Sequence, residues 1–304
     1  MLSYKPWKLE AIARLLIGVF ICMCAGSLLG AALYHGPAFQ KHRILFFILA
    51  VLIIGFLIAA LVELGKSWTV ENFRRRVSIF FACFYPGLIL LVWAQQLAGA
   101  PPANFTIGQM LIGVVSLQGA VLALTWRMLR QQQLNLNGAF GFSNHVAGAI
   151  IFGGIVAGIF LKVGNELQAL CHNLLSSPLS PVKPVEQQAV ETLRTATSLG
   201  TRIIAGICTI GLAPLGEETL FRGILYPTIK QAGFPKLAVW LTSIAFATIH
   251  MNAESFLPLL VLALLLILLY EKTNNLLAPI TAHAVFNAAQ FIYLYVHEHP
   301  RTGH

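Results

Sequence analysis

The sequence predicts an all-α protein, a polytopic bundle of about eight or nine transmembrane helices. Hydrophobic residues make up 57% of the 304 residues and charged residues only 10%, whereas a soluble domain carries about 25% charged residues. The apolar runs approach the roughly 20 residues that cross a bilayer. They are too long and too uniformly apolar for barrel strands, which alternate over about ten residues. These observations place the chain among integral membrane proteins.

The first apolar run follows Lys5 and Lys8 and extends over about 11–34. It is longer than the apolar core of a signal peptide, and no small-residue cleavage site follows it, so we expect a retained first span. The expected spans cover residues 11–34, 44–64, 77–98, 107–129, 145–163, 199–216, 236–251, 256–271 and 277–296. The runs 236–251 and 256–271 are short, which leaves the count at eight or nine.

Two polar stretches interrupt the spans. Residues 131–144 are expected to form a loop, and the prolines of 166–198 break any long helix there. Part of 166–198 is expected to form an amphipathic helix on the membrane surface. The chain then divides into an N-terminal transmembrane block of about five spans (1–165), this extramembrane segment (166–198) and a C-terminal transmembrane block (199–304). Every candidate catalytic residue lies in the last block.

The net charge of +9 is spread over short basic clusters between the apolar runs. This pattern is typical of contacts with lipid headgroups and does not predict nucleic-acid binding. Lys and Arg are more frequent on the side of the N-terminus, which predicts a multi-pass protein of the cell membrane with a cytoplasmic N-terminus. We then expect the segment 217–222 near the cytoplasmic end of its helix. The odd number of cysteines, five, does not indicate a disulfide framework.

Glu217, Glu218 and Arg222 form the first group of ionisable residues at membrane depth, where such groups are costly and indicate function. Adjacent helical residues point about 100° apart, so the two carboxylates serve different places. Glu218 and Arg222 are spaced i, i+4 and can form an ion pair. Glu217 is left as a candidate general base for water. The alternative is a solvated carboxylate pair at a helix end.

The second and third groups are pairs of residues four positions apart. Phe246 and His250 share one face of an apolar helix, and the alternative for His250 is a C-terminal cap. His283 and Asn287 share a face of the last helix and can both donate hydrogen bonds to a developing oxyanion. Their alternative is an interhelical polar contact.

Glu217, His250 and His283 would also make a plausible catalytic zinc set. The two histidines lie on different helices, however, and the sequence contains no His-Glu-x-x-His motif. We therefore expect no required metal or other cofactor, and a zinc-dependent version stays open.

Together, Glu-Glu-x-x-x-Arg, Phe-x-x-x-His and His-x-x-x-Asn resemble, in order, the motifs of the CAAX-protease and bacteriocin-processing (CPBP or Abi) family of intramembrane proteases. Its eukaryotic member is the Ras-converting endoprotease, CAAX prenyl protease 2. The resemblance covers about residues 185–296. It implies a glutamate-dependent peptide hydrolase with Glu217 and His250 activating water and His283 and Asn287 binding the oxyanion. Glu218, Arg222 and Phe246 would support them.

We therefore expect an endopeptidase that cleaves a membrane-associated, CAAX-like or leader peptide. Two alternatives from other classes remain. A non-catalytic membrane scaffold need not keep all these polar groups. A transporter could use a buried carboxylate as a proton relay, although the sequence shows no internal repeat. The identity of the substrate and the oligomeric state stay open.

Overall fold

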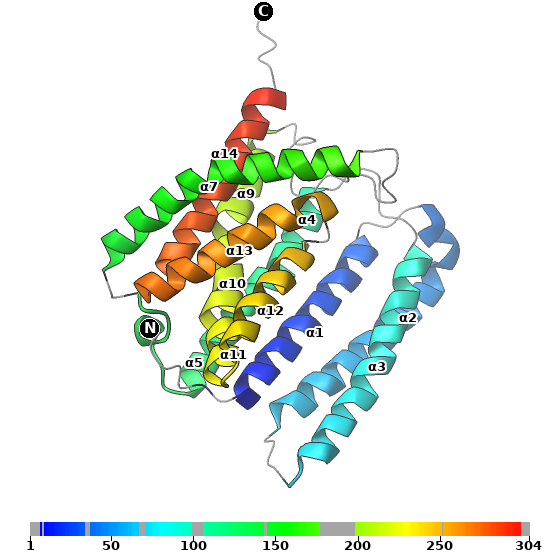
Figure 1. The fold of residues 1–304 in the computed structure, drawn as a ribbon. Helices are drawn as coiled ribbons and strands as arrows, with labels where there is room; N and C mark the ends of the chain where they lie inside the picture. The colour runs from blue at the N-terminus through cyan, green and yellow to red at the C-terminus, as the bar shows by residue number, and fades with distance from the viewer. Residues whose placement is uncertain are drawn as a thin grey trace, which may run out of the picture. The chain divides into compact units, whose positions relative to one another are not determined.

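The computed structural model describes residues 7, 9–33, 37–66, 71–98, 106–142, 145–176, 198–250 and 252–298. Within these ranges the regular elements are all helices, so the all-α prediction is confirmed (Figure 1). In chain order they are α1 (Leu9–Leu33), α2 (Pro37–Gly65), α3 (Phe73–Ala98), α4 (Ile107–Val114), η1 (Val115–Gly119), α5 (Ala120–Gln131), α6 (Leu136–Phe140), α7 (Val146–Leu175), α9 (Leu199–Gly206), η2 (Ile207–Leu212), α10 (Ala213–Glu218), η3 (Thr219–Leu225), α11 (Tyr226–Gln231), α12 (Pro235–Thr248), α13 (Ala253–Thr273) and α14 (Leu277–Glu298).

Seven helical stretches among the described residues are long and apolar enough to cross a membrane. They are Glu10–Ala31, Ile44–Glu63, Ile107–Gln131, Val146–Leu175, Leu199–Gln231, Ala253–Thr273 and Leu277–Leu294. The chain is therefore an integral, multi-pass membrane protein, as predicted. The expected span 77–98 is also helical, within the 26 residues of α3. The expected span 236–251 corresponds to α12, which has only 14 residues.

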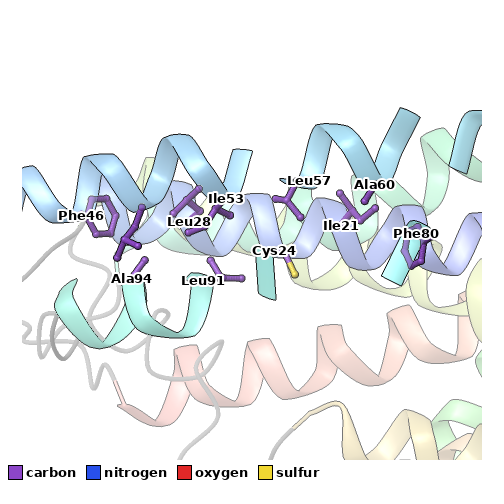
Figure 2. Packing of buried hydrophobic residues seen from close by; sticks show 11 residues of the cluster. Ile21, Cys24, Leu28, Phe46, Ile53, Leu57, Ala60, Phe80, Leu91 and Ala94 are labelled. Carbon is purple, nitrogen blue, oxygen red and sulfur yellow. The ribbon is translucent and has the colours of Figure 1, made fainter. Parts of the chain in front are cut away.

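The chain divides into two compact units, Lys8–Met128 and Met1–Trp7 with Leu129–His304. The first contains α1, α2 and α3, whose apolar side chains form one core cluster (Figure 2). Small residues let helices approach closely in this unit, because a Cβ on Gly26 would collide with Ser116 of η1. Glu63 of α2 is 2% exposed and accepts hydrogen bonds from Lys66 and Arg76 at 2.7 and 2.9 Å.

The second unit is built around α7, α13 and α14, and α7 packs against both of the others (Figure 1). Gly153 of α7 allows this approach, because a Cβ there would collide with the carbonyl oxygen of Ala278 in α14. Further along the same helices, Phe160 and Phe286 pack with their ring centroids 5.4 Å apart. The expected amphipathic helix within 166–198 falls largely on 177–197, outside the described residues, and α7 itself continues to Leu175.

Another helix of this unit is unusually long and runs without a break over Leu199–Gln231. It contains two π-helical segments, η2 and η3, and the candidate motif 217–222 spans the end of α10 and the start of η3. The expectation that this motif lies near the end of its helix is wrong. The helix continues because Glu218 and Arg222 neutralise each other and apolar residues resume directly after them. Such π segments occur frequently at functional sites.

Candidate functional site

Six of the seven predicted site residues converge at one place in the second unit. Glu217 and Glu218 come from α10, Arg222 from η3, Phe246 from α12, His250 from the turn after α12, and His283 from α14. The seventh, Asn287, lies one helical turn beyond His283 on α14. Five elements, spread over the 70 positions from Glu217 to Asn287, therefore supply this site.

Glu218 is the buried centre of the polar contacts. Its side chain is 0% exposed, and its Oε1 atom accepts a hydrogen bond from Nη1 of Arg222 and one from Nδ1 of His283, each at 2.9 Å. Arg222 also donates from Nη2 to the backbone oxygen of Ala263 in α13, at 3.1 Å. Both charges are buried away from water, so the loss of either partner would leave the other charge uncompensated and destabilise the fold. Through Arg222 the ion pair contacts α13, and through Glu218 it contacts α14.

Phe246 is the apolar centre of the site and is fully buried. Its ring lies 4.4 Å from the guanidinium carbon of Arg222, a distance at which a cation is attracted to an aromatic face. The ring centroids of His250 and His283 lie 5.0 and 5.7 Å away, and Phe221 packs edge-on at 5.4 Å. Phe246 thus fixes the positions of the arginine and of both imidazoles.

Glu217 faces the two imidazoles. Its Oε2 atom lies 3.9 Å from Nε2 of His250 and 4.0 Å from Nε2 of His283. Both separations exceed the length of a direct hydrogen bond. A water molecule bound to Oε2 and to one imidazole, at about 2.8 Å from each, fits such a separation. The Glu217 side chain is 11% exposed and that of His250 is 22% exposed, so both are largely enclosed but keep some accessible surface.

The partners of the two histidines assign their tautomers. Nδ1 of His250 lies 2.7 Å from the backbone oxygen of Phe246, and that of His283 lies 2.9 Å from Glu218. A carbonyl oxygen or a carboxylate only accepts, so Nδ1 carries a proton in both rings. Nε2 of each ring is then directed at Glu217. His250 therefore makes the cap-type contact that was its alternative assignment and also faces the carboxylate.

Asn287 contacts the backbone of η2. Its Nδ2 atom donates to the oxygen of Thr209 at 2.9 Å. An amide nitrogen carries two hydrogens, so one donor of Asn287 is committed to this interhelical contact. The other is available for a ligand in the hydrogen-bonding direction that the first leaves open. His283 and Asn287 share a face of α14, as their spacing predicts.

Sequence reasoning missed the two backbone oxygens that hold Arg222 and Asn287, those of Ala263 and Thr209. No side-chain pattern marks a carbonyl as an acceptor. It also missed the role of Glu271, which accepts from Tyr226 at 2.7 Å and pairs with Lys230, joining α13 to the end of the long helix.

The metal alternative can be compared with the geometry. Among the described residues, no three His, Cys, Asp or Glu side chains form a group able to hold a metal ion. Glu217, His250 and His283 do converge, but they do not make such a group in this arrangement. The zinc-dependent version stays a separate alternative for this site.

Comparison with known proteins gives matches that cover part of the chain. Residues 199–289 match the family model "Type II CAAX prenyl endopeptidase Rce1-like". The chain is 36% identical over 81 residues to "Uncharacterized protein YpbD" of Bacillus subtilis (strain 168), covering 25% of this chain and 39% of the relative. It is 31% identical over 77 residues to "UPF0177 protein YxdF" of Lactococcus lactis subsp. lactis (strain IL1403), covering 25% of this chain and 42% of the relative.

The alignments thus span about two fifths of the length of these curated relatives. No solved structure matches the chain. The matched residues 199–289 include all seven side chains placed above, from Glu217 to Asn287. Through this segment, the chain is similar to the Rce1-like family of type II CAAX prenyl endopeptidases, in agreement with the CPBP resemblance of its three motifs.

Proposed function

We propose that the protein is an intramembrane endopeptidase that hydrolyses a peptide bond in a membrane-associated, CAAX-like or leader peptide. The observation that carries the proposal is the position of Glu217, whose Oε2 atom lies about equally far from the Nε2 atoms of two histidines. The match of residues 199–289 to a prenyl endopeptidase family supports the same reaction class.

Glu217 acts as the general base in this mechanism. A water molecule donates hydrogen bonds to Oε2 of Glu217 and to Nε2 of His250, which lie 3.9 Å apart. His250 can accept because its other nitrogen donates to the oxygen of Phe246. As the water oxygen attacks the scissile carbonyl carbon, its proton passes to Glu217 and later to the leaving amine. The C–N bond then breaks.

His283 and Asn287 stabilise the oxyanion of the tetrahedral intermediate. A neutral His283 that donates from Nδ1 to Glu218 has only a lone pair at Nε2. It therefore donates to an oxyanion only as an imidazolium, which the adjacent Glu218 carboxylate stabilises electrostatically. Asn287 contributes its second amide hydrogen. Donors held in place before the reaction are the largest single contribution in many hydrolases.

The test compares Glu217→Gln with the matched control Glu166→Gln, which alters an exposed carboxylate on α7. The probe is an internally quenched peptide with a farnesylated C-terminal Cys-aliphatic-aliphatic-X sequence, assayed in detergent beside unprenylated and leader peptides. We expect Glu217→Gln to abolish cleavage without lowering the Tm, and Glu166→Gln to retain it. Normal cleavage by folded Glu217→Gln would overturn the mechanism.

The same assay with a strong chelator addresses the metal alternative. We expect cleavage to continue in the chelator, because the proposed mechanism uses no metal. Loss of cleavage that zinc restores would instead make Glu217, His250 and His283 ligands. If wild-type protein cleaves none of the peptides, the non-catalytic scaffold becomes the better description of this fold.

A further inference from the structure

Phe140, at the end of the short helix α6, packs directly against the backbone of the catalytic helix. Its side chain is 1% exposed. A Cβ atom added to Gly223 in η3 would lie 2.8 Å from Cε1 and 3.1 Å from Cδ1 of the Phe140 ring. Real Cβ atoms do not approach other atoms so closely, so only glycine fits at residue 223 while the ring is in place. Gly223 directly follows Arg222.

The Phe140 ring is itself held from behind by backbone contacts. The next residue, Gly141, has a φ of +75° and lies so close to Asn274 that a Cβ there would collide with the Asn274 carbonyl. The oxygen of Phe140 accepts a hydrogen bond from the backbone nitrogen of Leu276 at 2.9 Å. The segment before α14 therefore fixes α6, and α6 fixes the ring.

Trp7 adds a second line of contact to η3. Its indole, 7% exposed, packs on Phe140 with ring centroids 6.2 Å apart. The indole nitrogen donates to Oγ1 of Thr228 at 3.1 Å, and that hydroxyl donates to the oxygen of Ile224 at 2.6 Å. Both the ring stack and the hydrogen-bond relay thus end on adjacent residues of η3, Gly223 and Ile224.

We propose that Trp7 and Phe140 are positioning residues for the active site, an inference that rests on the proposed function. Neither touches the candidate catalytic groups. They fix η3, which carries Arg222; Arg222 holds Glu218, and Glu218 holds His283. Because π-helical segments are rare and usually as short as one turn, η3 depends on outside contacts to keep its geometry. Trp7 therefore belongs to the compact unit that holds the candidate site, although it lies more than 200 positions before Glu217 in the sequence.

The central experiment uses Gly223→Ala, the double variant Gly223→Ala/Phe140→Leu and the control Gly158→Ala, whose Cβ would meet open space on α7. With the farnesylated quenched peptide, Gly223→Ala should lower kcat by about tenfold to a hundredfold and change KM little, since small misplacements of catalytic groups have effects of that size. Phe140→Leu alone should also lower kcat, because the ring no longer holds η3, and the double variant should lose less than the two single effects combined, because the smaller side chain makes room for the new Cβ. An unchanged kcat in either single variant, or fully additive losses in the double variant, would overturn the proposal.

A second measurement does not depend on cleavage. The ¹⁵N resonances of the His283 ring, assigned by their loss in His283→Gln, report its hydrogen bond to Glu218. We expect Gly223→Ala and Phe140→Leu each to shift them, and Gly158→Ala to leave them unchanged. If Glu217→Gln retains cleavage, the proposed mechanism fails, while these resonances still decide whether Trp7 and Phe140 position the site. Resonances that match wild type in Gly223→Ala would contradict the positioning role.

The Trp7 relay is tested by Trp7→Phe and Thr228→Val, which remove the same hydrogen bond from either side. Each should lower kcat, and the two together should cost little more than Thr228→Val alone, because they act through one interaction. Fully additive effects, or no effect of either, would show that the relay does not act on η3.

Discussion

At the scale of single residues, one oxygen atom has two partners that belong to different helices. Oε1 of Glu218 accepts from Arg222, four residues along its own helix, and from His283, 65 residues away. All three side chains are at most 3% exposed. Removal of either partner would leave charge buried without compensation, and such losses are among the larger effects of single substitutions.

We therefore expect Arg222→Met, a change of similar length without the charge, to destabilise the protein by about 3–5 kcal/mol. The double variant Glu218→Gln/Arg222→Met should be more stable than Arg222→Met, because it removes the uncompensated carboxylate. Thermal unfolding in detergent measures both. A Tm of Arg222→Met equal to that of wild type would show that the ion pair does not contribute to stability.

The two partners of Glu218 also show what the sequence can predict for the site. The contact with Arg222 follows from helix geometry, because residues four apart share a face. The contact with His283 depends on how α10 packs against α14, and no local pattern encodes it. The same is true of the Ala263 and Thr209 oxygens, because every residue carries such an acceptor.

At the scale of elements, the helix Leu199–Gln231 differs most from its expected form. The charged residues 217–222 predict an end to the helix, but the ion pair and the cation–π contact with Phe246 allow the charges to lie mid-helix. Its π segments were not predictable, since they depend on side chains from other helices. Asn287 binds a carbonyl of η2, and Phe140 packs on η3. The helical type of the other runs followed from their apolar length alone.

The packing of α7 on α14 gives a prediction with a neighbouring control. Gly153→Ala would force its new Cβ against the Ala278 carbonyl, whereas a Cβ on Gly154 would meet no atom within 4 Å. We expect Gly153→Ala to destabilise by about 1–3 kcal/mol, the usual range for overpacking, and Gly154→Ala to have little effect. Equal Tm values for the two variants would contradict the close helix approach.

At the scale of the whole molecule, contacts in the second unit determine which helix ends share a membrane face. Trp7 contacts Thr228 and Phe140, and Glu271 contacts Lys230, so Trp7, α6 and the ends of α11 and α13 lie on one side. An even number of crossings must separate Trp7 from α6. Of the four long helical stretches between them, α3 is therefore expected to cross too, although it is not among the seven stretches that are long and apolar enough to cross by composition.

The basic residues near this face, including Lys230, Lys236 and Lys272, favour the cytoplasmic side. We expect Lys236→Cys, at the exposed start of α12, to resist an impermeant maleimide in intact cells. Leu174→Cys, at the exposed end of α7, should react. Both are made in a background without the native cysteines, and permeabilised cells provide the labelling maximum. The opposite pattern would reverse the orientation.

The boundaries of the two compact units also depend on contacts between residues far apart in the sequence. The polar stretch 166–198 suggests a division of the chain there, because composition changes at that point. The contacts divide it at Leu129 and assign Trp7 to the C-terminal unit. A single aromatic residue near the start of a chain gives no signal in its sequence that it packs beside residues more than a hundred positions away.

The place of Glu217 within its helix limits which peptide bonds can reach it. Glu217 and Gln231 are fourteen positions apart, which is at most about 21 Å at the α-helical rise of 1.5 Å per residue. An extended chain covers about 3.3 Å per residue, so roughly six residues are needed to span that depth. A bond closer than this to a folded cytosolic domain would draw the domain into the bilayer. Under the proposed endopeptidase function, bonds near folded domains would therefore be spared, and bonds at the end of a flexible tail would be cleaved.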